Sequence, residues 1–123
     1  MHKLFLCNHC GNITALIENA GVPLYCCGEK MHALTPESAE GAPEKHIPKY
    51  TREGNEIRVC VGENAHPMTE EHHISFVALE TDGGVQYRKL SAGGQPEVVF
   101  PILLGEQVTN IYAYCNLHGL WQV

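Results

Sequence analysis

The chain has 123 residues, enough for one domain with its own core and a smaller unit that needs extra stabilisation. Its net charge of -6 comes from 8 basic and 14 acidic residues, and the basic residues are not clustered, so nucleic acid is not an expected partner. The only apolar run near the start, Leu4-Phe5-Leu6, is too short for a secretion signal or a membrane span. We therefore expect a cytoplasmic protein without a membrane partner, whose six cysteines are thiolates or metal ligands rather than disulfides.

The first metal-binding pattern lies near the N-terminus, where Cys7 and Cys10 form a C-x-x-C turn and adjacent Cys26 and Cys27 follow later. Both pairs precede a glycine, and two such turns suit a tetrahedral site for iron or zinc. Neighbouring side chains of an extended strand point in opposite directions, so the adjacent pair requires a bent chain and a distorted tetrahedron. This spacing departs from a plain structural zinc site and is compatible with iron, with a disulfide or redox pair as the alternative.

The segment around these cysteines is expected to be a metal-stabilised domain. Residues 13–18 predict a short strand, 19–21 its turn, and 31–34 a brief apolar segment. So short a unit cannot build a sufficient core, and the metal is expected to supply its stability. Two prolines and a glycine then indicate a linker. We predict domains at 1–35 and 44–123, joined by a linker at 36–43.

Beyond the linker the pattern changes to short strands, predicted at 56–62, 73–80, 85–90 and 98–100, with the last strand at 108–115. In the first of these, Ile57, Val59 and Val61 share one face, while Cys60 lies on the polar face and is expected to be a spectator. The fold class predicted is therefore mainly β, with an immunoglobulin-like antiparallel β-sandwich after the small N-terminal domain.

A second group of metal-ligand residues lies in the predicted sandwich. Cys115 and His118 stand three residues apart at the end of the predicted last strand. Prolines beside two of the upstream histidines favour loops that project ligands from a scaffold. A lone histidine is more often a surface residue than a ligand, but several with a cysteine strengthen one another as candidates. The candidates are His46, His66, His72, Cys115 and His118.

Taken in order, these motifs resemble the desulfoferrodoxin family, the two-iron form of superoxide reductase, over essentially the whole chain. The N-terminal part of the resemblance rests on C-x-x-C with the adjacent cysteines. The C-terminal part rests on Glu44-Lys45-His46, on His66-Pro67-Met68, on His72 six residues after His66, and on Cys115-Asn116-Leu117-His118-Gly119.

The resemblance implies two irons per chain. It implies that Cys7, Cys10, Cys26 and Cys27 hold a rubredoxin-like iron in a desulforedoxin-like domain. It implies that the second, catalytic iron has His46, His66, His72 and His118 in an equatorial square and Cys115 as the axial ligand. Glu44 matches a possible sixth ligand and Lys45 the cation beside the open position. His73 is excluded because it should face the opposite side of its strand, and His2, His9 and His32 match no ligand position.

The activity implied is one-electron reduction of superoxide to hydrogen peroxide, with Glu44 and Lys45 as catalytic residues and a rubredoxin-like electron donor. The N-terminal iron is expected to be a structural staple with an optional redox role, and the family implies a homodimer. Two alternatives stay open: an iron electron-transfer protein without catalysis at the second site, and a zinc-stabilised binding module.

Overall fold

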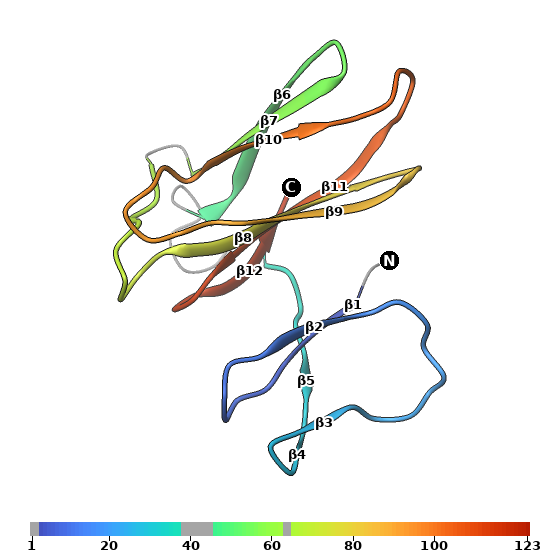
Figure 1. Ribbon diagram of the computed structural model, residues 1–123, viewed down its shortest axis with the longest axis vertical. Coiled ribbons are helices and arrows are strands. Elements are labelled where there is room, and N and C mark those ends of the chain that lie inside the picture. The colour runs from blue at the N-terminus through green and yellow to red at the C-terminus, as the bar shows by residue number, and fades with distance from the viewer. Residues whose placement is uncertain (1–2, 38–45, 63–64) are drawn as a thin grey trace. The chain divides into compact units, whose positions relative to one another are not determined.

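The computed structural model describes residues 3–37, 46–62 and 65–123 (Figure 1). The chain divides into two compact units, Met1–Thr35 and Pro36–Val123, called the N-terminal unit and the C-terminal unit below. Glu44, Lys45 and most of the predicted linker lie outside the described residues. No helix in the described part of the chain has the length and apolar character needed to cross a membrane.

The N-terminal unit has a three-stranded antiparallel sheet and a separate short hairpin. The sheet has the order β2-β1-β5, with β1 at Lys3–Leu6, β2 at Ile13–Leu16 and β5 at His32–Ala33. The hairpin joins β3 at Tyr25–Cys26 to β4 at Glu29–Lys30. Among the described residues of this unit, the buried hydrophobic side chains are Leu4, Cys7 and Met31 alone. So small a core needs another source of stability.

The C-terminal unit consists of two antiparallel sheets packed face to face, which confirms the predicted immunoglobulin-like sandwich (Figure 1). One sheet has the order β10-β7-β6, with β6 at Pro48–Glu53, β7 at Glu56–Val61 and β10 at Glu97–Pro101. The other has the order β12-β11-β8-β9, with β8 at Ile74–Thr81, β9 at Gly84–Lys89, β11 at Val108–Cys115 and β12 at Gly119–Gln122.

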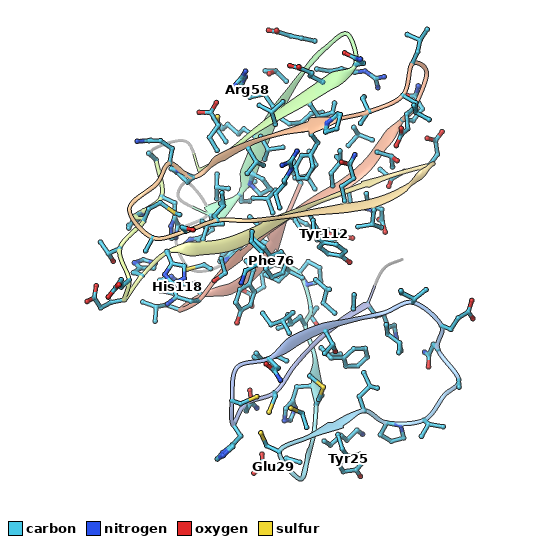
Figure 2. All side chains as sticks on the ribbon, viewed as in Figure 1. Tyr25, Glu29, Arg58, Phe76, Tyr112 and His118 are labelled. Carbon is cyan, nitrogen blue, oxygen red and sulfur yellow. The ribbon has the colours of Figure 1, made fainter. Side chains whose placement is uncertain are left out.

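Alternation along the strands builds the core between these sheets. Ile57, Val59 and Val61 of β7 are buried, and the residues between them are exposed, as the sequence predicts. On β11 the inward row ends with Ala113 and Cys115, both fully buried in the same hydrophobic cluster. Figure 2 shows the outer faces, with Arg58 on one sheet and Phe76 and Tyr112 on the other. The pleat therefore turns the sulfur of Cys115 into the sandwich.

The strand predicted at 108–115 agrees with β11, but the prediction that it is the last strand was wrong, because β12 follows and pairs with β11 as a hairpin. Gly119 opens β12 with a φ of 85°, a left-handed conformation that glycine adopts without strain. Glu37, within the predicted linker, forms a parallel bridge to Trp121 of β12. The amide of Glu37 donates to Leu120 O at 2.8 Å, and the amide of Gln122 donates to Glu37 O at 3.2 Å. Residue 37 thus extends the sheet at the outer edge of β12.

Candidate metal centres

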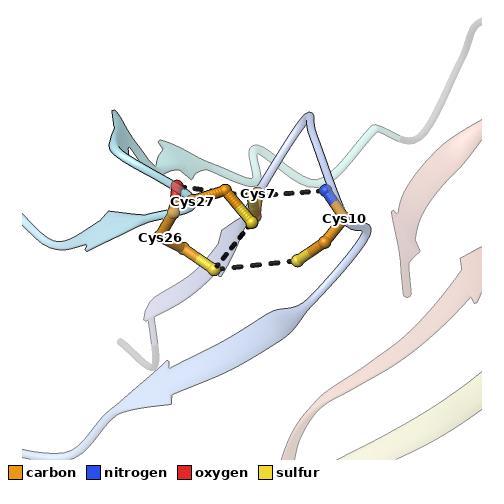
Figure 3. A group of neighbouring side chains, drawn as sticks. All are labelled: Cys7, Cys10, Cys26 and Cys27. Carbon is orange, nitrogen blue, oxygen red and sulfur yellow. Dashed lines mark hydrogen bonds between the residues drawn. The ribbon is translucent and has the colours of Figure 1, made fainter.

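The four cysteines of the N-terminal unit meet at one point (Figure 3). Their sulfur atoms all lie within 4.8 Å of one another. Cys10 Sγ is 3.7 Å from Cys26 Sγ, and Cys26 Sγ is 4.0 Å from Cys27 Sγ. All six cysteines of the chain are free thiols, all within the described ranges. We call Cys7, Cys10, Cys26 and Cys27 the four-cysteine cluster.

A tight turn after β1 positions the first two cysteines of this cluster. The amide of Gly11 donates to Cys7 O at 2.9 Å, and the amide of Cys7 donates to Asn12 O at 2.9 Å. The turn directs the amide of Cys10 at the Cys7 sulfur, at 3.5 Å. The side-chain amide of Asn12 points at the Cys26 sulfur at 3.6 Å. Such N–H groups stabilise negative charge on sulfur.

The second pair is brought together by a two-residue turn between β3 and β4. Cys27 has a φ of 55°, the only positive φ outside glycine in the described chain, and Gly28 follows with a φ of 75°. Positive φ at both positions is typical of a type I′ hairpin turn. A left-handed conformation costs a residue with a Cβ about 1–2 kcal/mol. This turn is the bend that the adjacent cysteines required.

The pKa values of the thiols indicate that the four-cysteine cluster is a cation site. The amide of Cys10, which points at the Cys7 sulfur, lowers the pKa of Cys7 to about 7. The pKa of Cys27 is raised to about 12, mainly by its hydrogen bond with the Cys10 side chain and by burial. A single sulfur can therefore ionise near neutral pH, but further ionisation is opposed by the neighbouring sulfurs. A bound cation removes this obstacle, so the donor set fits iron or zinc.

The second cluster lies at one end of the sandwich and contains the five residues predicted from the sequence. The donor atoms of His46, His66, His72 and Cys115 all lie within 4.8 Å of one another. The fourth histidine, His118, adjoins this set, with its Nδ1 3.0 Å from His46 Nε2 and 3.7 Å from Cys115 Sγ. We call these five residues the histidine–cysteine cluster.

The four imidazoles of this cluster form a square. Neighbouring ring centroids are 4.7 Å apart for His46 and His66, 4.7 Å for His66 and His72, 5.1 Å for His72 and His118, and 4.8 Å for His118 and His46. The diagonal from His46 to His72 is longer, at 6.4 Å. Neighbouring rings are tilted 66–82° to one another, so they do not stack. Four rings directed at a common centre are the arrangement of an equatorial ligand set.

His66 shows that the square suits a cation. Its Nδ1 is 2.7 Å from Pro67 O, so that nitrogen carries the hydrogen and donates it to the carbonyl. Its Nε2 is buried and has no hydrogen-bond partner among the described residues, so a lone pair points into the cluster. Burial lowers the pKa of His66 to about 4, which keeps the ring neutral at pH 7. A neutral imidazole with its other nitrogen fixed by a carbonyl is a typical metal ligand.

Trp121 supports two corners of the square, a role that the sequence analysis did not assign. Its indole stacks on the ring of His46, with centroids 4.8 Å apart and planes 19° apart. Its Nε1–H donates to His118 O at 3.2 Å. The side chain is fully buried. A tryptophan two residues after the C-terminal motif could have suggested such a role, because a buried indole needs an acceptor for its N–H.

The cluster has a dry side and a solvent side. Cys115 is fully buried, and His46 and His66 are buried as well, whereas His118 is exposed at the edge where β11 meets β12 (Figure 2). His73 is not among the clustered donors, and its Nδ1–H donates to Thr69 O at 2.9 Å. Of the remaining residues considered, His9, His32 and Cys60 are exposed, and His2, Glu44 and Lys45 lie outside the described residues.

A family model described as Desulfoferrodoxin matches residues 38–123. The chain belongs to the desulfoferrodoxin family. It is similar to a desulfoferrodoxin of Nitratidesulfovibrio vulgaris, 41% identical over 122 residues that cover 98% of this chain and 94% of the relative. It is also similar to a superoxide reductase of Pyrococcus horikoshii, 35% identical over a match covering 72% of this chain and 91% of the relative.

Solved structures divide into full-length and partial matches to this desulfoferrodoxin. The superoxide reductase of Treponema pallidum has a TM-score of 0.86 and 38% identity, and the match covers 100% of this chain and 97% of that chain. The one-iron superoxide reductase (1Fe-SOR) of Giardia intestinalis has a TM-score of 0.55 and 32% identity, covering 65% of this chain and 95% of that chain. Together with the two donor sets, family membership gives the chain two iron sites: one of four thiolates, the other of four histidines and one cysteine.

Proposed function

We propose that this desulfoferrodoxin reduces superoxide by one electron to hydrogen peroxide at the histidine–cysteine cluster. The chain is an oxidoreductase of the superoxide reductase type, the name carried by its relatives and structural neighbours. The observation that carries the proposal is the square of four imidazoles with a buried cysteine sulfur beside it. The overall step consumes one superoxide, one electron and two protons and yields one hydrogen peroxide.

In this proposal each cluster holds one iron. The four-cysteine cluster would hold the first iron, and the histidine–cysteine cluster would hold the second, with Cys115 supplying its thiolate. Iron bound in the second cluster supplies the reducing electron. Four neutral imidazoles and one thiolate bring a single negative charge, so a ferrous ion keeps a net positive charge that attracts an anion. The low pKa of His66 supports this count, because the ring stays neutral.

The surroundings of the cluster would set the direction from which superoxide arrives. Cys115 lies on the core side, among apolar side chains that exclude water. His118 lies on the solvent side. A small anion would therefore reach the cluster from the solvent side, where His118 is exposed, while burial of Cys115 limits the screening of its charge.

Glu44 and Lys45 complete the proposal, although both lie outside the described residues. Lys45 directly precedes His46 in the sequence, so its ammonium would attract superoxide and donate hydrogen bonds to the reduced product. Glu44 would supply a carboxylate ligand in the resting state and help to displace product. Because the net charge is -6, attraction of an anion must come from this local field rather than from the whole protein.

We further propose a rubredoxin-like donor, a homodimer, and a reducing cytoplasm as the compartment. Six free thiols, four of them in one cluster, support a reducing environment. The N-terminal iron would act mainly as a staple, since its unit buries few apolar side chains, and an additional relay of electrons through it is optional.

The test is an anaerobic pulse of superoxide onto the reduced protein, with iron and zinc counted per chain. A fast, stoichiometric change to a ferric-thiolate absorption with peroxide as product is expected. Cys115→Ser should abolish this reaction, whereas the matched variant Cys60→Ser should react like the wild type, because Cys60 is exposed on β7. Slow reaction of a fully iron-loaded protein would instead support a purely electron-transferring second site, and zinc in place of iron would support a binding module.

The role of Lys45 has its own test. Lys45→Ala should slow the bimolecular reaction with superoxide and flatten its dependence on ionic strength, with both irons retained. The matched variant Lys89→Ala removes a cation from β9 and should leave the salt dependence of the reaction unchanged. An unchanged rate and salt slope in Lys45→Ala would remove this residue from the mechanism.

A further inference from the structure

Asn116 connects the two segments that supply His72 and the Cys115–His118 pair. Its side-chain oxygen accepts the amide of His73 at 2.8 Å, and its side-chain nitrogen donates to Glu71 O at 2.9 Å. Its own amide donates to His73 O at 3.1 Å. The side chain thus binds the backbone on both sides of His72.

The loop that carries His72 is held from the other side by Thr69. The hydroxyl of Thr69 accepts the amide of His72 at 3.1 Å and lies 3.2 Å from His72 O. The amide of Thr69 donates to His72 O at 2.9 Å. The ring of His73 donates to the carbonyl of Thr69, which closes the turn on itself. The backbone of His72 is therefore fixed between a turn and an asparagine.

Strand pairing alone does not provide this connection. The pairing of β11 with β8 shifts register at its end, where Tyr114 pairs with Phe76 but Cys115 pairs with Ile74. Ser75 is the extra residue, so the ladder is irregular beside the cluster. A bulge redirects side chains but weakens the local ladder. The side chain of Asn116 supplies two hydrogen bonds immediately beyond that point.

We propose that Asn116 is a positioning residue that sets His72 against Cys115 and His118, so that the histidine–cysteine cluster is formed before metal binds. The inference rests on the proposed metal site and deepens it. Ligand side chains that are already held in place lose little conformational freedom when the metal binds, so a preorganised cluster binds the metal more tightly. Without the two side-chain bonds, the backbone hydrogen bond from Asn116 N–H to His73 O remains, but the 69–73 loop is held less firmly to the Cys115–His118 turn and one corner of the square loosens.

The experiment compares two asparagine variants on the same strand, using the full chain loaded with iron. Asn116→Ala removes both bonds to the 71–73 backbone, and the control Asn110→Ala removes a side-chain bond from Asn110 to Glu80 of 2.7 Å, farther along β11. Hydrogen exchange of the 69–74 peptide and transfer of ferrous iron to a competing chelator are measured. We expect faster exchange and about 10–100-fold weaker iron binding in the second cluster of Asn116→Ala only. Iron in the four-cysteine cluster is the internal reference and should not change.

Two further variants keep the outcome decisive. Asn116→Asp retains an oxygen acceptor for His73 N–H but loses the donor to Glu71 O, so an intermediate effect is expected. Thr69→Val removes only the hydroxyl, and it carries the test if Asn116→Ala does not fold. Wild-type exchange and wild-type iron affinity in Asn116→Ala would overturn the positioning role. Absence of iron from this cluster in the wild type would instead overturn the proposed function.

Discussion

Replacing Trp121 by phenylalanine is expected to destabilise the C-terminal unit by about 2 kcal/mol, summed from the two contributions that follow. Phenylalanine keeps a ring beside His46 but removes the Nε1–H that donates to His118 O. The lost hydrogen bond contributes about 1 kcal/mol. The smaller ring leaves roughly 40 Å³ in a fully buried site, which at about 24 cal/mol per Å³ adds roughly 1 kcal/mol. The sum corresponds to a roughly 30-fold increase in the unfolding equilibrium constant.

Urea unfolding of the metal-free chain, followed by far-UV circular dichroism, measures this change. With a slope of roughly 1.5 kcal/mol per molar urea, the midpoint should fall by about 1.3 M at unchanged slope. Phe100→Leu is the control, because Phe100 is equally buried in the core. Both variants should lose stability, but only Trp121→Phe should also weaken iron binding in the histidine–cysteine cluster. A midpoint shift below about 0.3 M would refute the assigned hydrogen bond and packing.

Three further predictions follow from local features. Gly119→Ala should lower the free energy of unfolding by about 1–2 kcal/mol, because a residue with a Cβ is strained at a φ of 85°. The added Cβ meets nothing within 4 Å, so the loss comes from backbone strain and not from a clash. Gly54→Ala, also at positive φ, should lower the free energy of unfolding by a similar amount, but only Gly119→Ala should alter the iron-thiolate spectrum. Identical spectra for the two variants would contradict the link between Gly119 and the histidine–cysteine cluster. Burial and the neighbouring Glu97 carboxylate raise the pKa of Cys60. Glu97→Gln should therefore lower that pKa and speed alkylation of Cys60 by iodoacetamide at a fixed pH below it. An unchanged pH profile of alkylation would show that the carboxylate does not raise the pKa. Removing iron from the four-cysteine cluster should unfold the N-terminal unit, seen as loss of hydrogen-exchange protection across residues 3–34; retained protection would show a self-sufficient core.

The parts of the fold that were predictable from the sequence are those with strict alternation or a strong turn signal. Ile57, Val59 and Val61 alternate with polar residues, and the predicted strand agrees with β7 to one residue. The adjacent cysteines required a bent chain, and Cys27 provides it. In contrast, β12 has only four residues and begins within the Cys115–Gly119 motif, so it was not recognised as a separate strand. The two-residue strands of the N-terminal unit are too short to show any period.

The metal-ligand residues that the structure brings together were predictable from the sequence, but the residues that support them were not, and Glu44 and Lys45 stay predictions. The histidines and Cys115 are residue types with metal-binding chemistry, and the sequence motif brought them together as one set. Asn116 acts through the backbone of Glu71 and His73, whereas Trp121 stacks on the distant ring of His46. Which group each side chain meets depends on strand register rather than on residue type. Register is specified by the whole sheet, which includes a bulge after Tyr114 that no local pattern predicts.

The two clusters differ in the length of chain between their first and last ligand residues, and this difference sets the order in which they can form. The four-cysteine cluster closes over residues 7–27, whereas His46 and His118 are 72 positions apart. Closing the longer loop costs more chain entropy and requires the pairing of β8, β11 and β12. Domains fold from the N-terminus during synthesis, so the cysteine donors can assemble while most of the sandwich is still absent. We therefore expect the four-cysteine cluster to be able to bind iron first, and the histidine–cysteine cluster only after the β11–β12 hairpin has emerged and docked.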